Sequence, residues 1–297
     1  MSRRICILIA VLALPVSCLA SSVAHSKVKV GRTVAHVVTI DLNDPEVKVS
    51  VALARGGAGR QEAFKSIVGR TRPTAAMTGT FFDTRTLMPT GDIAVSGTVV
   101  HSGVIGSALC IDSDNKASII GFKDGRSRAW KGWETVLCAG PRLVKNGRVR
   151  IVLRREGFRA SLSTPARRTG VGITRSGKLL LVVINRPASL RDIARVFVSR
   201  GAVDALCLDG GSSTALYESG SFRAMPMRRL TNCLVVYSKN SSYLAARNEL
   251  APAKCFAKLP QRSTSEFAIT NLLPRLLTLG SLARPAPQSP AVVRAGH

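Results

Sequence analysis

The chain has 297 residues, and its hydrophobic content of 45% is enough for a sizeable core in one large domain or two small ones. Lys and Arg number 43 against 17 Asp and Glu, which gives a formal net charge of +26. This charge favours anionic partners such as acidic lipid, nucleic acid or anionic polysaccharide, although its even spread also fits a generally basic surface. Aromatic residues make up only 5%, and no motif interleaves them with basic residues for base stacking, so nucleic acid is not an expected partner.

The N-terminus has the pattern of a secretory signal peptide. Arg3 and Arg4 form a positive start, residues 5–14 are an uncharged apolar run, and small residues follow, with cleavage expected after Ala20 or Ala24. The apolar run is too short for a comfortable membrane span, and no second such segment follows. We therefore expect a periplasmic or secreted protein with no membrane span once the signal is removed.

Cysteine usage argues against a structural zinc site. Removal of the signal leaves five cysteines with no CxxC pair and no paired Cys/His spacing. An oxidising compartment permits disulfides, but an odd number means that at least one thiol is free or pairs between chains. The sequence indicates no cofactor and leaves a divalent metal ion open.

In chain order, the hydrophobic pattern predicts short strands that outnumber helices. We expect an antiparallel hairpin from 34–40 and 47–53, a short helix over 61–68, and a second hairpin from 93–101 and 104–111. The pattern weakens beyond residue 238, so residues 239–297 are assigned to a poorly ordered tail, most clearly the proline-rich 285–297. The predicted class is α/β (α+β), a single domain built on a mixed β-sheet.

A strand–helix–strand unit is predicted over 178–209. KLLLVVI at 178–184 is an apolar, β-branched run, and Ser189 then offers a helix N-cap with Asp192 three residues on. One apolar stripe follows over 190–197. A crossover of this length makes the two strands parallel.

The second strand of this unit ends at Asp209. Gly210 and Gly211 follow at once, then the hydroxyls of residues 212–214. Ligands in such sheets bind beyond the carboxyl ends of strands, and the glycines let a ligand approach the main chain. The hydroxyls and N–H groups suit a sugar or phosphate oxygen. A solvated Asp-Gly-Gly turn is the alternative interpretation.

Two further stretches carry candidate polar groups. Residues 74–83 (TAAMTGTFFD) run through Gly79 into two aromatics, which predicts a close backbone approach or a strand with a glycine bulge. Asn146-Gly147 predicts a hairpin turn after a Gly-Pro bend. Ten basic residues against one acid lie within 142–175, which supports an anion-binding surface.

Taken together, these motifs resemble those of the phosphodiester glycosidase family over residues 30–238. Residues 74–83 are similar to its Asn-Gly-x-Phe-Phe segment, 139–147 to Gly-Gly-Pro…Asn-Gly, 168–172 to Arg-Thr-Ala-x-Gly, 209–214 to Asp-Gly-Gly-Gly-Ser-Thr, and Arg228 with Asn232 to a later Arg…Asn pair. Each motif alone is weak, but their common order is fairly specific.

The resemblance implies hydrolysis of a glycosyl phosphodiester, in which arginines bind phosphate and carboxylates give acid/base help. Asp209 is the first candidate for a catalytic carboxylate, and its partner is Asp83, Asp92 or Glu134. Arg168, Arg186 and Arg228 are candidate phosphate clamps, although a salt-bridge role suits each one equally. The other expected substrate-binding positions are Thr78, Gly79, Gly210, Gly211, Ser212, Ser213 and Asn232.

Several positions depart from the family pattern. Thr78 stands where Asn is usual, Arg167 replaces a proline, residues 184–186 keep only the arginine of Asp-Gly-Arg, and Ser212 replaces a glycine. Two functions therefore stay open. One is an exported glycoside hydrolase that cleaves a glycosyl phosphodiester or an anionic cell-envelope polysaccharide. The other is a non-catalytic binding protein for anionic polysaccharide on the same fold.

Overall fold

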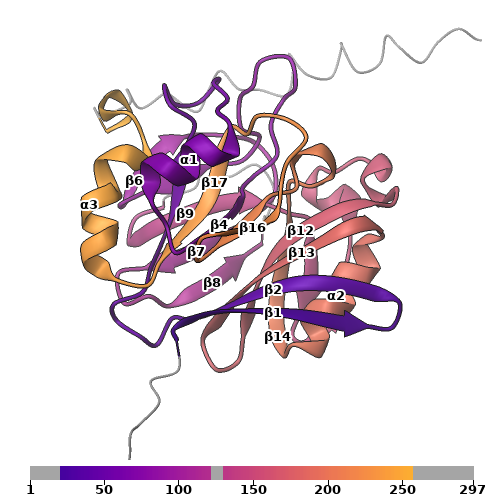
Figure 1. The fold of residues 1–297 in the computed structure, drawn as a ribbon. Coiled ribbons are helices and arrows are strands. Elements are labelled where there is room, and N and C mark those ends of the chain that lie inside the picture. The colour runs from indigo at the N-terminus through magenta and orange to yellow at the C-terminus, as the bar shows by residue number, and fades with distance from the viewer. Residues whose placement is uncertain (1–20, 122–129, 257–297) are drawn as a thin grey trace, which may run out of the picture. The chain divides into compact units, whose positions relative to one another are not determined.

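The computed structural model describes residues 21–121 and 130–256 (Figure 1). The apolar run of the expected signal peptide and the proline-rich segment 285–297 lie outside the described residues. The helices in the described part are α1 (Phe64–Thr71), α2 (Leu190–Ser199) and α3 (Asn240–Leu250), with short 3₁₀ helices η1 (Leu153–Glu156), η2 (Ala160–Ser163), η3 (Gly211–Ser213) and η4 (Ala253–Cys255). No described helix has the length and apolar character needed to cross a membrane. Strands outnumber helices, as expected.

The first sheet has seven strands. Its spatial order is β1 (Val23–Val30), β2 (Thr33–Asp41), β13 (Lys178–Ala188), β12 (Ala166–Thr174), β14 (Ala202–Leu208), β10 (Arg142–Lys145) and β11 (Arg148–Val149). Side chains alternate between its two faces. Leu181 and Leu206 face a central core, whereas Leu180 and Ala205 face α2 on the other side.

Helix α2 confirms the predicted strand–helix–strand unit. The Ser189 hydroxyl accepts the Asp192 N–H and the Asp192 carboxylate accepts the Ser189 N–H, which makes a complete capping box. Phe197 is fully buried on this face. A Cβ added at Gly172 would lie 2.6 Å from the Phe197 ring, and one at Gly170 would lie 2.9 Å from it. The glycines of the Arg-Thr-Gly-Val-Gly stretch therefore let the helix pack closely on β12.

The two strands of this unit run parallel but are not neighbours. Strand β12 lies between β13 and β14 and pairs antiparallel with both. All strand pairs among the described residues are antiparallel, so the expected mixed sheet is an antiparallel one. The sequence of a strand–helix–strand unit does not reveal whether another strand lies between its two strands. Here β12, which comes earlier in the chain, lies between β13 and β14.

The second sheet has five strands and carries two helices. Its order is β16 (Ser221–Ala224), β15 (Leu216–Glu218), β4 (Ala75–Thr78), β17 (Asn232–Tyr237) and β3 (Lys48–Leu53). Helix α1 occupies much of the predicted 61–68 segment but starts three residues later. Helix α3, with Leu250 fully buried, lies within the segment that was expected to be poorly ordered from 239. That expectation is wrong for residues 240–250, because α3 docks on the sheet despite its weak amphipathic pattern.

The third sheet also has five strands, in the order β6 (Thr98–His101), β5 (Ile93–Val95), β9 (Trp133–Ala139), β7 (Ser107–Asp112) and β8 (Ala117–Ile120). The hairpin in this region turns at Ser96 and Gly97, whose φ angles are 49° and 74°, and not at Ser102-Gly103 as expected. Two residues with positive φ match the twist of a tight hairpin. The central core is shared by all three sheets and includes Leu181, Leu234 and Leu137.

The opening hairpin was also paired differently from the prediction. Strand β2 pairs with β1 on one side and β13 on the other, whereas β3 joins the second sheet beside β17. Strand β1 begins at Val23, earlier than the expected domain start at residue 30. Sequence alone shows which segments are extended but not which partner each one takes.

Candidate active site

The predicted motifs meet where strands of two sheets end. The N–H of Asp209, which follows β14, donates to the carbonyl oxygen of Gly79 at 3.0 Å. Gly79 follows β4, and its own N–H donates to the carbonyl oxygen of Asn232 at 3.2 Å. Two backbone hydrogen bonds therefore join three segments that lie far apart in the sequence.

Gly79 allows this junction because no other residue fits. A Cβ at this position would lie 1.9 Å from Oδ1 of Asn232. That oxygen accepts the N–H of Thr80 at 2.8 Å, and the Asn232 side chain is 2% exposed. Thr78 is similarly buried at 1% exposure. In this structure the Asn232 side chain therefore supports the backbone of the loop, and neither Thr78 nor Asn232 presents its side chain to solvent.

Asp209 lines a cavity of about 250 Å³. The cavity is lined by Phe81, Ser161, Leu162, Thr164, Pro165, Ala166, Arg168, Leu208, Asp209, Gly210 and Gly211. Burial raises the pKa of Asp209 to about 6, against the opposing effects of hydrogen bonds from the Ser213 side chain and the Gly210 backbone and of the charge on Arg228. A carboxyl group with this pKa exchanges a proton near neutral pH, as a catalytic acid or base must.

The turn after Asp209 is built into its surroundings. Gly210 passes close to β12, since a Cβ there would lie 2.6 Å from the carbonyl oxygen of Arg167. Gly211 has a φ of 56° and opens toward free space. Ser213 is 2% exposed, whereas Ser212 is exposed and its carbonyl oxygen accepts the N–H of Met227 at 2.7 Å. This last bond ties the turn to the segment that carries Arg228.

Arg228 is the arginine whose charge acts on Asp209. Its guanidinium carbon lies 4.4 Å from the centroid of the Phe82 ring, a cation–π arrangement. The residue is partly exposed, and it forms no ion pair with any residue that the structure describes. The stacked guanidinium is therefore held in place while its donors stay available to an anion.

Arg168 also lines the cavity, but most of its donors are used by the protein. Its Nε donates to the carbonyl oxygen of Ala188 at 2.9 Å, and its Nη2 donates to the carbonyl oxygens of Leu162 at 3.0 Å and of Thr164. With 3% exposure, Arg168 connects the η2 wall of the cavity to β13. Arg186, by contrast, is exposed at the end of β13 and does not line the cavity.

The other candidate carboxylates lie outside the cavity. Asp83 is exposed and accepts the N–H groups of the two residues Arg85 and Thr86, which lowers its pKa. Asp92 is buried and accepts hydrogen bonds from the Gly103 N–H and the Trp130 indole, both at 2.7 Å. Glu134 is exposed on β9 of the third sheet. Among the described lining residues, Asp209 is the only carboxylate.

Two supporting residues were not predicted. The hydroxyl of Thr169 donates to the backbone carbonyl of Asp209, which fixes the peptide next to the carboxylate. Arg167 donates through Nη1 to the carbonyl oxygen of Met225 at 3.2 Å and through Nη2 to Oδ1 of Asn185 at 3.3 Å. Arg167 and Asn185 are both departures from the family pattern, and they contact each other here. The sequence signal for this contact was that both positions depart from the family pattern.

No group of three or more His, Cys, Asp or Glu side chains with metal-binding geometry occurs in the described ranges. A cavity with one perturbed carboxylate and an adjacent guanidinium suits a glycosidase-type enzyme that acts on an anionic substrate. The phosphodiester glycosidase family model matches residues 71–237, more than half of the chain. The chain belongs to the phosphodiester glycosidase family.

Similar solved structures share the fold. One is a Synechocystis protein of unassigned role, at 17% identity and TM-score 0.62, with 72% of this chain and 61% of that one covered. Another is the zebrafish N-acetylglucosamine-1-phosphodiester alpha-N-acetylglucosaminidase catalytic domain, auto-inhibited by its pro-peptide, at 20% identity and TM-score 0.61, with 74% and 85% covered. A third, from Burkholderia pseudomallei, is named as an exported protein, at 15% identity and TM-score 0.56, with 69% and 74% covered. No sequence among curated proteins matches this chain.

Proposed function

We propose that this chain is an exported hydrolase that cleaves glycosyl phosphodiesters, with Asp209 as the catalytic base and Arg228 as the phosphate-binding cation. The observation that carries the proposal is the carboxyl group of Asp209, whose pKa is raised to about 6 in a cavity close to the charge of Arg228. Family membership and the phosphodiester substrate in the name of the zebrafish structure support this substrate class.

The presence of one carboxylate favours a phosphate leaving group. An ordinary glycoside leaves as an alcohol, which needs a second carboxyl group to supply a proton. A phosphomonoester leaves as a stable anion and needs only positive charge. Water attacks the anomeric carbon and passes a proton to Asp209, while the bond from that carbon to the phosphate oxygen breaks and its electron pair leaves with the phosphate. A glycosyl phosphodiester therefore suits this site better than a polysaccharide joined by ordinary glycosidic bonds.

A non-catalytic binding protein for anionic polysaccharide is the second candidate. The observation that favours it is the position of Asp83, Asp92 and Glu134, none of which lines the cavity. A binding protein on this fold would keep Arg228 and the cavity but would need no proton transfer by Asp209.

The test compares two substrates of one sugar, its methyl phosphodiester at the anomeric position and its methyl glycoside. We expect the purified chain to release sugar from the first and not from the second. Because Asp209 must be ionised to act as a base, kcat should rise with pH through about 6 and then level. Asp209→Asn should lower kcat by at least about 10²-fold. Binding of a panel of glycosyl phosphodiesters without any turnover would favour the binding protein instead.

A further inference from the structure

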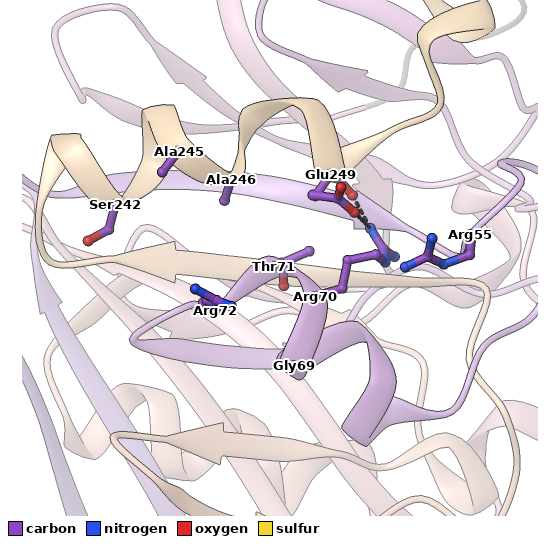
Figure 2. Close-up of a pocket in the computed structure, with 9 residues that line it drawn as sticks. All are labelled: Arg55, Gly69, Arg70, Thr71, Arg72, Ser242, Ala245, Ala246 and Glu249. Carbon is purple, nitrogen blue, oxygen red and sulfur yellow. Dashed lines mark hydrogen bonds and ion pairs between the residues drawn. The ribbon is translucent and has the colours of Figure 1, made fainter.

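A second and larger cavity lies between α1 and α3 (Figure 2). Its volume is about 580 Å³, within the range of sites that hold small ligands. The lining residues are Arg55, Gly69, Arg70, Thr71, Arg72, Ser242, Ala245, Ala246 and Glu249. None of these residues lines the cavity of Asp209, so the two sites are separate.

Arg70 holds this pocket together. Its guanidinium pairs with Glu62 at 2.7 Å, donates to the carbonyl oxygen of Leu53 at 2.9 Å, and donates to the backbone carbonyl of Glu249. The dashed contact in Figure 2 shows how Arg70 of α1 reaches Glu249 of α3. The Arg70 side chain is 7% exposed and its charge is largely balanced by the two glutamates, so its role is to join the walls.

Two other arginines of the pocket have no such partner. Arg55 and Arg72 are exposed, and neither side chain forms an ion pair or a hydrogen bond with a residue that the structure describes. The Arg55 backbone is held by its N–H, which donates to the Glu62 carboxylate at 2.8 Å. Arg72 caps α1 in a left-handed conformation with a φ of 43°. Both backbones are fixed, and both guanidinium groups are available to an anion.

The first turn of α3 contributes an exposed serine to the pocket. Ser242 lies in this turn, which has no side-chain cap and no acidic residue, although Glu46 accepts the N–H of Asn240 at 3.2 Å. Figure 2 shows Ser242 and Arg72 toward one end of the pocket and Arg55 with Glu249 toward the other. The pocket therefore combines guanidinium groups with small polar positions.

We propose that this pocket binds a phosphorylated sugar unit. A guanidinium fork matches phosphate oxygens in bidentate fashion, and Arg72 and Arg55 offer one such fork at each end of the pocket. The exposed hydroxyl of Ser242 suits a sugar hydroxyl, whereas the Thr71 hydroxyl is buried and donates to the carbonyl oxygen of Ile67. The choice of a sugar as the ligand rests on the proposed function, whereas the choice of phosphate rests on the two unpaired arginines.

The test measures binding of glucose 1-phosphate, inorganic phosphate and glucose by calorimetric titration. The chain carries Arg228→Ser throughout, so that phosphate at the Asp209 cavity does not contribute. In this background, Arg55→Ser/Arg72→Ser should weaken the binding of glucose 1-phosphate by about 10-fold or more, because the charge-assisted contact to its phosphate is lost whichever end of the pocket the phosphate occupies. The control is Arg32→Ser/Arg175→Ser, which removes the same charge from exposed turns elsewhere and should change binding by less than about 2-fold.

Equal weakening by both pairs would overturn the proposal, because the effect would then belong to the general charge of the protein. Inorganic phosphate binding as tightly as glucose 1-phosphate would overturn the assignment of a sugar. These titrations require no turnover, so they test ligand binding to this pocket even if the chain does not hydrolyse phosphodiesters. Hydrolysis of a small methyl phosphodiester should be unchanged in Arg55→Ser/Arg72→Ser with Arg228 restored, which keeps this pocket distinct from the catalytic site.

Discussion

Among single residues, Asp209 lowers the stability of the folded chain when its buried carboxyl group is ionised. Burial raises the pKa of Asp209 from 3.8 to about 6, so between these values the folded chain binds more protons than the unfolded chain. Stability contributed by this group therefore falls as pH rises from about 4 to about 6, and the full penalty applies above that window. Functional sites often carry such a cost because catalysis needs the perturbed group.

This cost predicts that Asp209→Asn stabilises the protein at neutral pH. The amide has nearly the same shape but carries no charge, so the penalty disappears. We expect a gain of roughly 1 to 2 kcal/mol at pH 7.5 and none at pH 4, measured by denaturant unfolding at both values. A mutant that is less stable than the wild type at pH 7.5 would show that Asp209 stabilises the turn and is not a strained functional group.

Arg228 gives a second prediction at the residue scale. Arg228→Lys keeps the charge but loses the planar stacking on Phe82 and the bidentate fork. We expect kcat/KM for a glycosyl phosphodiester to fall by about 10-fold. The matched control is Arg186→Lys, at an exposed position whose charge, unlike that of Arg228, is not among those that act on the Asp209 carboxyl group, and there kcat/KM should stay within about 2-fold. An equal fall in kcat/KM for both variants would show that Arg228 has no specific role in binding the phosphate.

At the scale of elements, the contact between α2 and β12 fixes the wall behind the site. Gly172 leaves no room for a larger residue, since a Cβ there would lie 2.6 Å from the Phe197 ring. The strand beyond this contact carries Arg168 and Thr169, which hold the cavity wall and the Asp209 peptide. The position of the site therefore depends on how closely this helix packs.

This packing predicts that Gly172→Ala destabilises the fold by about 1 to 3 kcal/mol through overpacking. Replacing Phe197 by Leu in the same chain should recover part of the loss, because the smaller side chain relieves the contact. The control is Gly69→Ala in α1, where an added Cβ meets nothing within 4 Å. Thermal and denaturant unfolding measure all three. An additive loss in the double mutant would contradict the proposed contact.

At the scale of the whole molecule, strand β1 bears on where the mature chain begins. Val23 is 3% exposed and pairs with Ile40 at the edge of the first sheet, and the carbonyl of Ser22 accepts the N–H of Asp41 at 2.8 Å. Cleavage after Ala24 would remove these contacts, whereas cleavage after Ala20 would keep them. The sheet therefore favours the earlier of the two expected sites.

We predict that the exported protein begins at Ser21. Intact-mass analysis of protein from the native compartment measures the N-terminus directly. As a control, an engineered chain that begins at His25 should be less stable than one that begins at Ser21, because it lacks the buried Val23 side chain. A native chain that begins near Met1, or at His25 with unchanged stability, would contradict the prediction.

Features that depend on a few neighbouring residues could be predicted from the amino-acid sequence. The cap at Ser189, the buried stripe of α2 and the Asp209 turn were all predictable, because a cap, a helical face and a glycine turn depend on near neighbours. The order of the motifs likewise led to the family, although none of the individual motifs was decisive.

The partner of each strand and the surroundings of each polar side chain became clear only from the folded chain. Strands β2 and β3 look like one hairpin in sequence, yet they join different sheets because their best partners, β13 and β17, lie more than a hundred residues away. Asp83 and Asp92 lie in or near motifs that resemble the family pattern, as Asp209 does, but their carboxylates accept local hydrogen bonds and neither residue lines the cavity. Such choices depend on long-range contacts, and a short stretch of sequence does not contain them.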